Sequence, residues 1–454
     1  MADGTVMDID DEIPFDVPEG WAWCRLKEVC TVLMGQSPEG SSVSGNSNGM
    51  EFHQGKIYFT DKYLAKAENY TSDITRAAPA NSILLCVRAP VGVVNITNRE
   101  ICIGRGLCAI RPKYEISENF WFYWLQYLKE DFEQKATGTT FKAISVEVVK
   151  QQFIPIPTLN EQKNIVSAIE NIFAQIDTLE QNKSDLQTAI KQAKSKILDL
   201  AIHGKLVSQN PTDEPASVLL EKLRAEKEAK IKSGELKRDK NDSYIYKSAT
   251  DNCHYQRFAD GTEEPLEITN EIPQNWTWCS LGEISTKLKR GKSPTYTEKS
   301  SIMAFAQKCN QKEGPATLEK ALYIDESTLK KYSEEEKMQF NDIVINSTGT
   351  GTLGRVGIFN CKIPDDVVAV YPDSHVSSVR INPSLFAKYF YYFVKNKQNY
   401  LEEMGEGSTN QKELKIDTIA NLIVPLPPLA EQKRIVEKIE NAFAKLDFIA
   451  EQLA

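Results

Sequence analysis

The sequence predicts an α+β protein with two pseudo-repeated α/β domains separated by two long antiparallel coiled-coil helices. Three observations lead to this fold class. A proline-flanked helical segment occurs twice in the 454 residues, a tryptophan-rich segment precedes each copy, and short apolar runs bounded by Gly, Asn, Ser and Pro lie between them. Internal repetition of this kind indicates a duplicated structural unit. We therefore expect both halves to fold in the same way.

The repeated helical segment runs from Pro155 to Asp177 (PIPTLNEQKNIVSAIENIFAQID) and from Pro425 to Asp447 (PLPPLAEQKRIVEKIENAFAKLD), with 14 of 23 positions identical. In each copy a Pro-x-Pro precedes apolar residues spaced three and four apart, which is typical of an amphipathic helix. The first helix is expected to continue to about His203, because Gly204 supplies a stop signal.

Apolar residues along both helices alternate at spacings of four and three, which is the pattern of a coiled-coil seam. We expect the two helices to pack on each other within the chain; the alternative is two unrelated amphipathic helices. The predicted seam residues are Ile165, Ile169, Ile172, Ile176, Leu179, Leu186, Ile190, Ile197 and Leu200 in the first helix and Ile435, Ile439, Leu446 and Ile449 in the second.

Each repeat opens with Trp-x-Trp-Cys, in VPEGWAWCRLKEV (17–29) and IPQNWTWCSLGEI (272–284). Strand-like runs follow, for example at 82–87, 91–96 and 342–345. The predicted parts are a first domain (1–158), a first spacer helix (159–204), a charged linker or helical connection (205–258), a second domain (259–424) and a shortened second spacer helix (425–454).

An aromatic stretch occurs late in each domain. We align Phe120, Tyr123, Trp124 and Tyr127 with Phe386, Tyr389, Phe390 and Phe393. Their shared spacing of three and four residues predicts the core face of a helix, with base stacking as the alternative.

Composition sets limits on the function. The formal charge of -9 argues against coating nucleic acid by bulk charge, although a local basic face can bind it. The nine cysteines form no CxxC pair or zinc-ligand spacing, so we expect reduced thiols and no metal site. The acidic first residues and the lack of a long apolar run favour a cytoplasmic protein.

Motifs for catalysis are missing from the sequence. There is no GxxxxGK[ST], no HExxH and no Asn/Asp-Pro-Pro-aromatic loop for methyl transfer to a base. GTGTLG at 349–354 formally matches a dinucleotide fingerprint, but the following RVGIFNCKIP predicts a strand where that motif needs a helix. We therefore expect a strand-turn-strand there, and a binding protein that is not an enzyme.

One loop candidate for contact with nucleic acid is TKLKRGKSPTY at 286–296, which contains Lys287, Lys289, Arg290 and Lys292 and no acidic residue. Exposed cations on a loop can neutralise phosphates or reach guanine edges. An ordinary solvated loop is the alternative.

The WxWCxL heads, the two P[IL]Px-L-x-EQKxIVxxIE helix entries and the phrase AIHGKLVSQNP together resemble the DNA specificity subunit of type I restriction-modification systems. The resemblance covers nearly the whole chain. It implies two target-recognition domains, each reading one half of a bipartite double-stranded DNA site, and two helices that set their spacing. The alternatives are a stand-alone sequence-specific DNA-binding regulator and a structural coiled-coil adaptor.

The resemblance also implies partners: modification (methyltransferase) subunits and a restriction (endonuclease/translocase) subunit, with no membrane. S-adenosylmethionine, ATP and Mg are expected on those partners, with no cofactor on this chain. The candidate DNA-binding residues are the four loop cations above together with Arg88, Thr139, Thr140, Lys142, Ser408, Thr409 and Lys412.

The second helix is shorter than the first, because seven residues follow Asp447 whereas about 25 helical residues follow Asp177. We therefore expect Leu186, Ile190, Ile197 and Leu200 to lack a matching run in the second copy. A partner, either a modification subunit or a second copy of the chain, is expected to cover this apolar stripe; natural truncation and recombination between the repeats are the alternatives.

Overall fold

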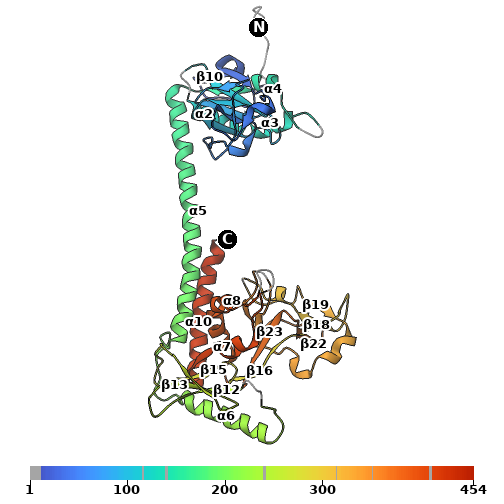
Figure 1. Ribbon diagram of the computed structural model, residues 1–454. Helices are drawn as coiled ribbons and strands as arrows, with labels where there is room; N and C mark the ends of the chain where they lie inside the picture. The colour runs from blue at the N-terminus through green and yellow to red at the C-terminus, as the bar shows by residue number, and fades with distance from the viewer. Residues whose placement is uncertain are drawn as a thin grey trace, which may run out of the picture. The chain divides into compact units, whose positions relative to one another are not determined.

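The structure is a computed structural model that describes residues 12–114, 117–138, 142–238, 242–312, 314–349, 351–407 and 412–453 (Figure 1). The chain divides into two compact units, unit 1 (Met1–Gln181) and unit 2 (Asn182–Ala454). The long helix α5 (Leu159–Ile202) begins in unit 1 and ends in unit 2. The predicted α+β class with repeated units is confirmed.

Unit 1 alternates short strands with short helices. Before α5, its elements are β1 (Ala22–Arg25), α1 (Leu26–Val29), β2 (Cys30–Met34), η2 (Gly40–Ser42), β3 (Val43–Ser44), β4 (Met50–His53), η3 (Lys56–Tyr58), β5 (Tyr70–Thr71), β6 (Ala77–Ala78), β7 (Ser82–Cys86), β8 (Val94–Thr97), β9 (Ile101–Ile103), β10 (Leu107–Pro112), α2 (Glu118–Tyr127), α3 (Lys129–Lys135), α4 (Val146–Lys150) and β11 (Phe153–Ile156).

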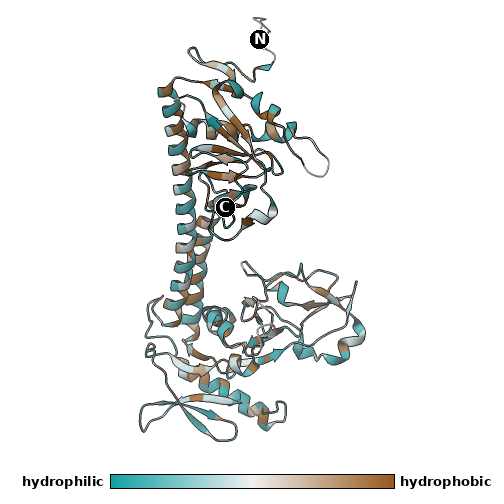
Figure 2. Cartoon of the chain, turned by 45° about the horizontal axis from the view of Figure 1, so that its top comes forward, coloured by the Kyte–Doolittle hydropathy of each residue, from teal (hydrophilic) through white to brown (hydrophobic). Residues whose placement is uncertain are grey.

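Two sheets form the core of unit 1. The first has the antiparallel order β2-β10-β7-β8, and the second has the order β3-β5-β4-β9-β6 with a parallel β4–β9 pair. Every residue of β7 is buried. Because side chains alternate along a strand, Ile83 and Leu85 pack with the helices whereas Leu84 and Cys86 pack with the second sheet. In Figure 2 these strands are largely brown, the colour of hydrophobic residues.

Unit 2 contains more elements than unit 1. After α5 they are α6 (Ala216–Lys232), β12 (Ser243–Lys247), β13 (His254–Phe258), β14 (Glu263–Leu266), β15 (Thr277–Ser280), β16 (Ser285–Arg290), β17 (Tyr296–Thr297), β18 (Ile302–Phe305), η4 (Gln307–Cys309), β19 (Leu322–Ile324), η5 (Glu326–Lys331), η6 (Glu334–Glu336), β20 (Ile343–Asn346), β21 (Val356–Ile358), β22 (Ala369–Pro372), β23 (Val376–Ile381), α7 (Ala387–Asn396), α8 (Gln398–Glu403), α9 (Ile416–Ala420), β24 (Ile423–Leu426) and α10 (Leu429–Gln452).

The sheets of unit 2 repeat the topology of unit 1. The order β16-β23-β20-β21 matches β2-β10-β7-β8, and the parallel β18–β22 pair matches β4–β9. The shared asparagine before the central strand has a positive φ in both units, 62° at Asn81 and 72° at Asn341. Asparagine tolerates this left-handed conformation. The antiparallel β20–β21 pair confirms that the GTGTLG segment joins two strands.

Each unit is closed by the segments that are repeated in the sequence. The Trp-x-Trp-Cys strand pairs antiparallel with the Pro-x-Pro strand, with Trp23 opposite Pro155 and Trp278 opposite Pro425. The repeated segments therefore have the same structural role in both units, which is to pair the first strand of the domain with its last strand.

The glutamine of the repeated EQK motif fixes the entry to each long helix. Gln162 donates to the Pro157 carbonyl (3.0 Å) and accepts from the Ser117 amide (3.2 Å). Gln432 donates to the Pro427 carbonyl (2.9 Å), and it accepts from the Phe386 amide (3.0 Å). Both side chains are buried, so each satisfied amide locks the long helix to the aromatic helix.

These equivalent bonds correct the alignment of the aromatic stretches. Ser117 corresponds to Phe386, so Phe120 corresponds to Tyr389 and the predicted alignment was wrong by three residues. A shift of three residues is almost one helical turn and keeps the same face, so periodicity could not detect it. The core face itself is confirmed in α7, where Tyr389, Phe390 and Phe393 are buried, whereas Tyr127 at the end of α2 is 66% exposed.

The C-terminal part of α5 and α10 lie side by side in unit 2 and run antiparallel (Figure 1). Lys194 pairs with Asp447 near the end of α10, and its ammonium lies 5.2 Å from the Phe443 ring centroid. Gln209, just after α5, binds Glu431 at the start of α10. The predicted antiparallel arrangement of the two helices is confirmed.

The antiparallel direction corrects the predicted uncovered stripe. Ile190 is 6% exposed, and Ile197 and Leu200 are half-buried, so these residues are not left bare. Ile165 and Ile169 are half-buried, Leu446 is half-buried, and Ile435 and Ile439 are fully buried. The exposed seam residues are Ile172, Ile176, Leu179, Leu186 and Ile449. Of the four residues expected to be uncovered, only Leu186 is exposed, because the C-terminal part of α5 lies beside α10.

The segment predicted as a linker at 205–258 contains α6 and two strands of the β12-β13-β14 sheet. The boundary at 258/259 cuts this sheet between β13 and β14. The sheet packs on unit 2 through Ile245, which is 2% exposed, and Gln256, which is 8% exposed. Sequence reasoning missed these strands because tyrosine alternates with only a few apolar residues there, which is a weak strand pattern within a charged sequence. In the described part of the chain no helix could span a membrane.

Candidate nucleic-acid interface

A groove in unit 1 is formed by the segments that follow β4, β7 and β9. Its volume is about 330 Å³. The lining residues, here called the cationic groove, are Gln54, Gly55, Lys56, Ile57, Cys86, Arg88, Ala89, Pro90, Arg105 and Gly106. Because β4 and β9 are parallel neighbours, the residues after both strands lie at the same edge of their sheet.

The charge of the cationic groove is entirely positive. Lys56, Arg88 and Arg105 are exposed, and the lining contains no acidic residue. Within the described residues, none of the three forms a salt bridge. Free, exposed cations that face one groove are able to neutralise phosphates of nucleic acid.

Arg88 is held beside Lys142 by main-chain contacts. Arg88 forms a β-bridge with Ala143, and the Ala89 amide donates to the Lys142 carbonyl at 3.1 Å. Lys142 is exposed. The structure therefore brings together these two predicted residues. Thr139 and Thr140, predicted in the same turn, lie outside the described residues.

Arg105 projects from a Gly-Arg-Gly turn with little freedom. The Gly104 amide donates to the His53 carbonyl (2.8 Å), and the Gly106 carbonyl accepts from the Val87 amide (3.0 Å). A Cβ atom on Gly106 would lie 2.3 Å from the Gln54 carbonyl oxygen. The two glycines thus permit close backbone packing, and the arginine is presented from a fixed turn.

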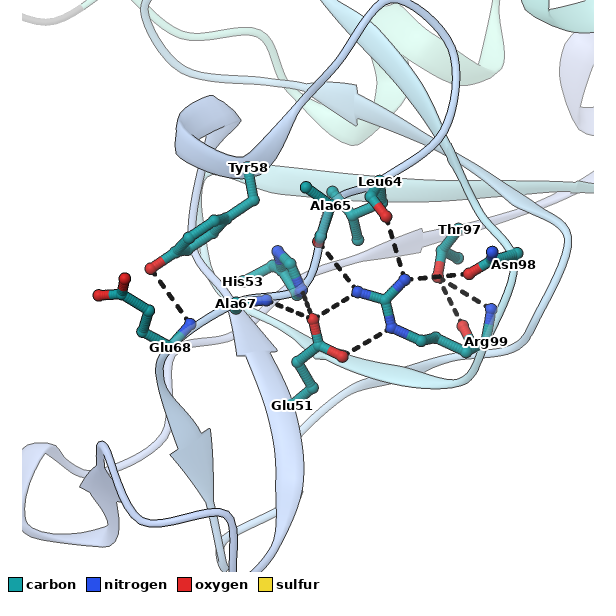
Figure 3. Close-up of polar contacts among 10 residues, drawn as sticks. All are labelled: Glu51, His53, Tyr58, Leu64, Ala65, Ala67, Glu68, Thr97, Asn98 and Arg99. Atoms are coloured by element: carbon teal, nitrogen blue, oxygen red, sulfur yellow. Dashed lines mark hydrogen bonds and ion pairs between the residues drawn. The ribbon is translucent and has the colours of Figure 1, made fainter.

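An ion pair between half-buried Arg99 and buried Glu51 supports the strand that leads into this groove (Figure 3). Arg99 donates to both carboxylate oxygens of Glu51 at 2.5 and 2.6 Å, and to the carbonyls of Leu64 and Ala65. Glu51 also accepts from the Ala67 amide at 2.6 Å. This network fastens the segment 64–67 to β4, directly before Gln54 and Lys56.

His53 also contacts Glu51, at 2.9 Å, and both of these groups have shifted pKa values. Burial acts to raise the pKa of Glu51, but hydrogen bonds from Arg99, Ala67 and His53 outweigh it and lower the pKa to about 2. Burial lowers the pKa of His53, and its contact with Glu51 only partly opposes this. The network therefore contains a carboxylate anion at neutral pH.

In unit 2 the first part of the predicted cationic loop, up to Arg290, is the strand β16, and the expectation of four exposed cations there is wrong. Lys287 lies on β16, is 6% exposed and donates to Asp342 at 2.9 Å. Arg380 binds the same carboxylate with two nitrogens at 2.8 Å. Alternation along β16 points Lys287 inward, where only an ion pair compensates the burial of its charge.

The other cations of this segment are also close to acidic groups. Arg290 pairs with Glu413, and Lys292 binds Glu336 at 2.8 Å. Lys289 is 53% exposed in its side chain and lies 4.0 Å from Glu335. These acids come from segments distant in the sequence, so inspection of 286–296 alone could not reveal them.

Unit 2 has a different set of side chains at the place that corresponds to the cationic groove. Thr348, two residues after β20, bridges Glu413 as Arg88 bridges Ala143. Its hydroxyl binds His375 Nδ1, and Thr352 contacts Gln307 at 3.1 Å. Lys412 is exposed next to Glu413. Ser408 and Thr409 lie outside the described residues.

Sequence reasoning missed Lys56 and Arg105. Arg105 had one signal, since an arginine between two glycines predicts a cation at the tip of a tight turn. Lys56 had none, because an isolated exposed lysine is common on any surface. Only the parallel β4–β9 pair brings these two residues to one groove. Within the described residues no cluster of His, Cys, Asp and Glu could hold a metal ion.

Two repeated α+β units, one with a groove of free cations, fit the class of modular DNA-binding proteins. The family model of the type I restriction modification DNA specificity domain matches residues 18–188 and 273–454. The chain belongs to this family of specificity subunits, which are not catalytic. The predicted family and the prediction that the chain is not an enzyme are confirmed.

Individual relatives agree with this assignment. The chain is 37% identical over 194 residues to a putative type I restriction enzyme MjaX specificity subunit of Methanocaldococcus jannaschii, a match that covers 42% of the chain and 44% of that protein. It is 24% identical to the EcoEI specificity subunit of Escherichia coli over 98% of the chain and 81% of that protein. The crystal structure of the HsdS subunit from Thermoanaerobacter tengcongensis shares the fold, with a TM-score of 0.58, 16% identity and coverage of 97% and 93%.

Proposed function

We propose that this chain is the sequence-specific DNA-binding subunit of a type I restriction-modification complex. Unit 1 and unit 2 each carry one target-recognition domain, and each domain reads one half of a bipartite double-stranded site. The observation that carries this proposal is the groove of exposed, unpaired Lys56, Arg88 and Arg105 in a chain of the DNA specificity family.

The helices α5 and α10 set the spacing of the half-sites and dock the modification and restriction subunits. Exposed apolar side chains on α5, among them Ile172, Phe173 and Leu179, support such docking. The partner subunits act in the cytoplasm and bind S-adenosylmethionine, ATP and Mg, whereas this chain selects the DNA sequence at which they act.

The test is a domain exchange in the complete complex. Residues 12–158 are replaced by the matching domain of a relative, and methylated sites are mapped after co-expression with the modification subunit. One half of the recognition site should change and the other should remain. A change in both halves would contradict independent reading, and methylation that does not depend on this chain would favour a stand-alone regulator.

A further inference from the structure

At two pairs of equivalent positions unit 1 has arginine and unit 2 has a residue with a hydroxyl group. Arg88 lies two residues after β7 and Arg105 two residues after β9. The equivalent positions, two residues after β20 and two residues after β22, are Thr348 and Ser374. Unit 1 therefore has two guanidinium groups where unit 2 has two hydroxyls.

Arginine at these positions differs chemically from the lysines nearby. A guanidinium is a planar fork that can donate two parallel hydrogen bonds, whereas an ammonium acts as a point charge. In the major groove, guanine offers two adjacent acceptors, O6 and N7, that fit this fork. Lys56 and Lys142 are suited to phosphate, and Arg88 and Arg105 are also suited to a base edge.

The backbone at both arginines is fixed, as a base-reading site requires. Around Arg88, the Val87 amide binds the Gly106 carbonyl, and the Ile144 amide binds the Val87 carbonyl at 2.9 Å. The Arg105 amide donates to the Ser37 hydroxyl at 3.3 Å. Neither guanidinium is paired with a carboxylate within the described residues, so both remain available to a ligand.

We propose that Arg88 and Arg105 make the first half-site depend on guanine, and that the second half-site lacks this dependence at the corresponding place. The inference rests on the proposed function, because it assigns base specificity within the same groove. In unit 2 the Thr348 hydroxyl contacts His375 and the Thr352 hydroxyl contacts Gln307, so neither of these contacts involves a guanidinium.

The experiment compares R88K, R105K, R88A, R105A and K56Q in the full chain, co-expressed with the modification subunit. R111K is the matched control, because Arg111 is an exposed arginine at the opposite end of β10. Two quantities are measured. The first is the methylated DNA motif, and the second is the affinity, at a fixed salt concentration, for a set of duplexes that each differ from the target by one base pair.

The lysine variants keep the charge and lose the fork. R88K or R105K should lose about 5- to 150-fold discrimination for G·C at one position of the first half-site, the range of one bidentate contact. K56Q should weaken all duplexes equally, and R111K should change neither quantity.

Two other results would overturn the proposal in different ways. If both lysine variants keep the wild-type motif, or weaken all duplexes equally, the arginines contact phosphate and the guanine assignment fails while the groove remains a DNA site. If R88A, R105A and K56Q bind every duplex like the wild type, the groove is not a DNA site and the proposed function of unit 1 fails with it.

Discussion

Lys287 and Asp342 form a buried ion pair in unit 2, with the lysine nitrogen 2.9 Å from a carboxylate oxygen that Arg380 also binds. The side chains are 5% and 1% exposed. Asp342 therefore neutralises the charges of two cations, Lys287 and Arg380, whereas Lys287 has Asp342 as its partner. Loss of Asp342 should for this reason destabilise unit 2 more than loss of Lys287.

Replacing Asp342 with alanine should destabilise unit 2 by about 3–5 kcal/mol, because it leaves a buried ammonium unpaired. Replacing Lys287 with methionine should cost far less, since Arg380 still binds the carboxylate with two nitrogens. Denaturant unfolding of the two variants measures the difference. Equal losses would show that the lysine pair has its own large contribution.

The Glu51–Arg99 pair should make unit 1 sensitive to acid. The pKa of Glu51 is lowered from 4.5 to about 2 in the folded chain, so its stabilisation is complete above pH 4.5 and is lost as the pH falls towards 2. Glu51→Gln should remove about 1–3 kcal/mol at pH 7 and much less at pH 2.5. Thermal unfolding between these pH values tests this, and a loss independent of pH would contradict it.

The cations of unit 1 should contribute more to the salt dependence of DNA binding than Lys287 on β16. K56Q and K142Q should each reduce the slope of log K against log salt by about 0.9, the value for one phosphate contact. K287M should leave the slope unchanged because its charge is buried and paired. Titrations at four salt concentrations, with R111Q as the control, measure these slopes.

The antiparallel pairing of α5 with α10 predicts losses of stability of different size for two neighbouring seam residues. Ile190→Ala should destabilise unit 2 by about 2–5 kcal/mol because Ile190 is buried. Leu186→Ala should cost about 0.5–1 kcal/mol because Leu186 is 41% exposed. Hydrogen exchange along α10 reports the effect, and similar protection in both variants would argue against this register.

The purified chain should transfer no methyl group to DNA. A labelled methyl donor, target DNA and the chain alone are incubated, and incorporation is compared with the same reaction after the modification subunit is added. Turnover by the chain alone would contradict the assignment of the chemistry to partner subunits.

The sequence by itself determined the duplicated architecture, the family and the course of the long helix. The predicted spacer helix, 159–204, agrees with the helix Leu159–Ile202 within two residues. These features are local, because proline, glycine and apolar spacing act through neighbours on the chain. The duplicated architecture could then be predicted because segments of similar sequence adopt similar folds.

Tertiary structure alone decided which cations are free. Lys287 and Arg105 are both cations near a glycine in the sequence, yet one is buried against Asp342 and the other is exposed in a groove. The difference depends on contacts between segments 50 or more residues apart, which fix the charge and the burial around each side chain. Tertiary structure also decided which part of the first helix is covered by α10, because periodicity defines an apolar face but not the stretch of the partner that it meets.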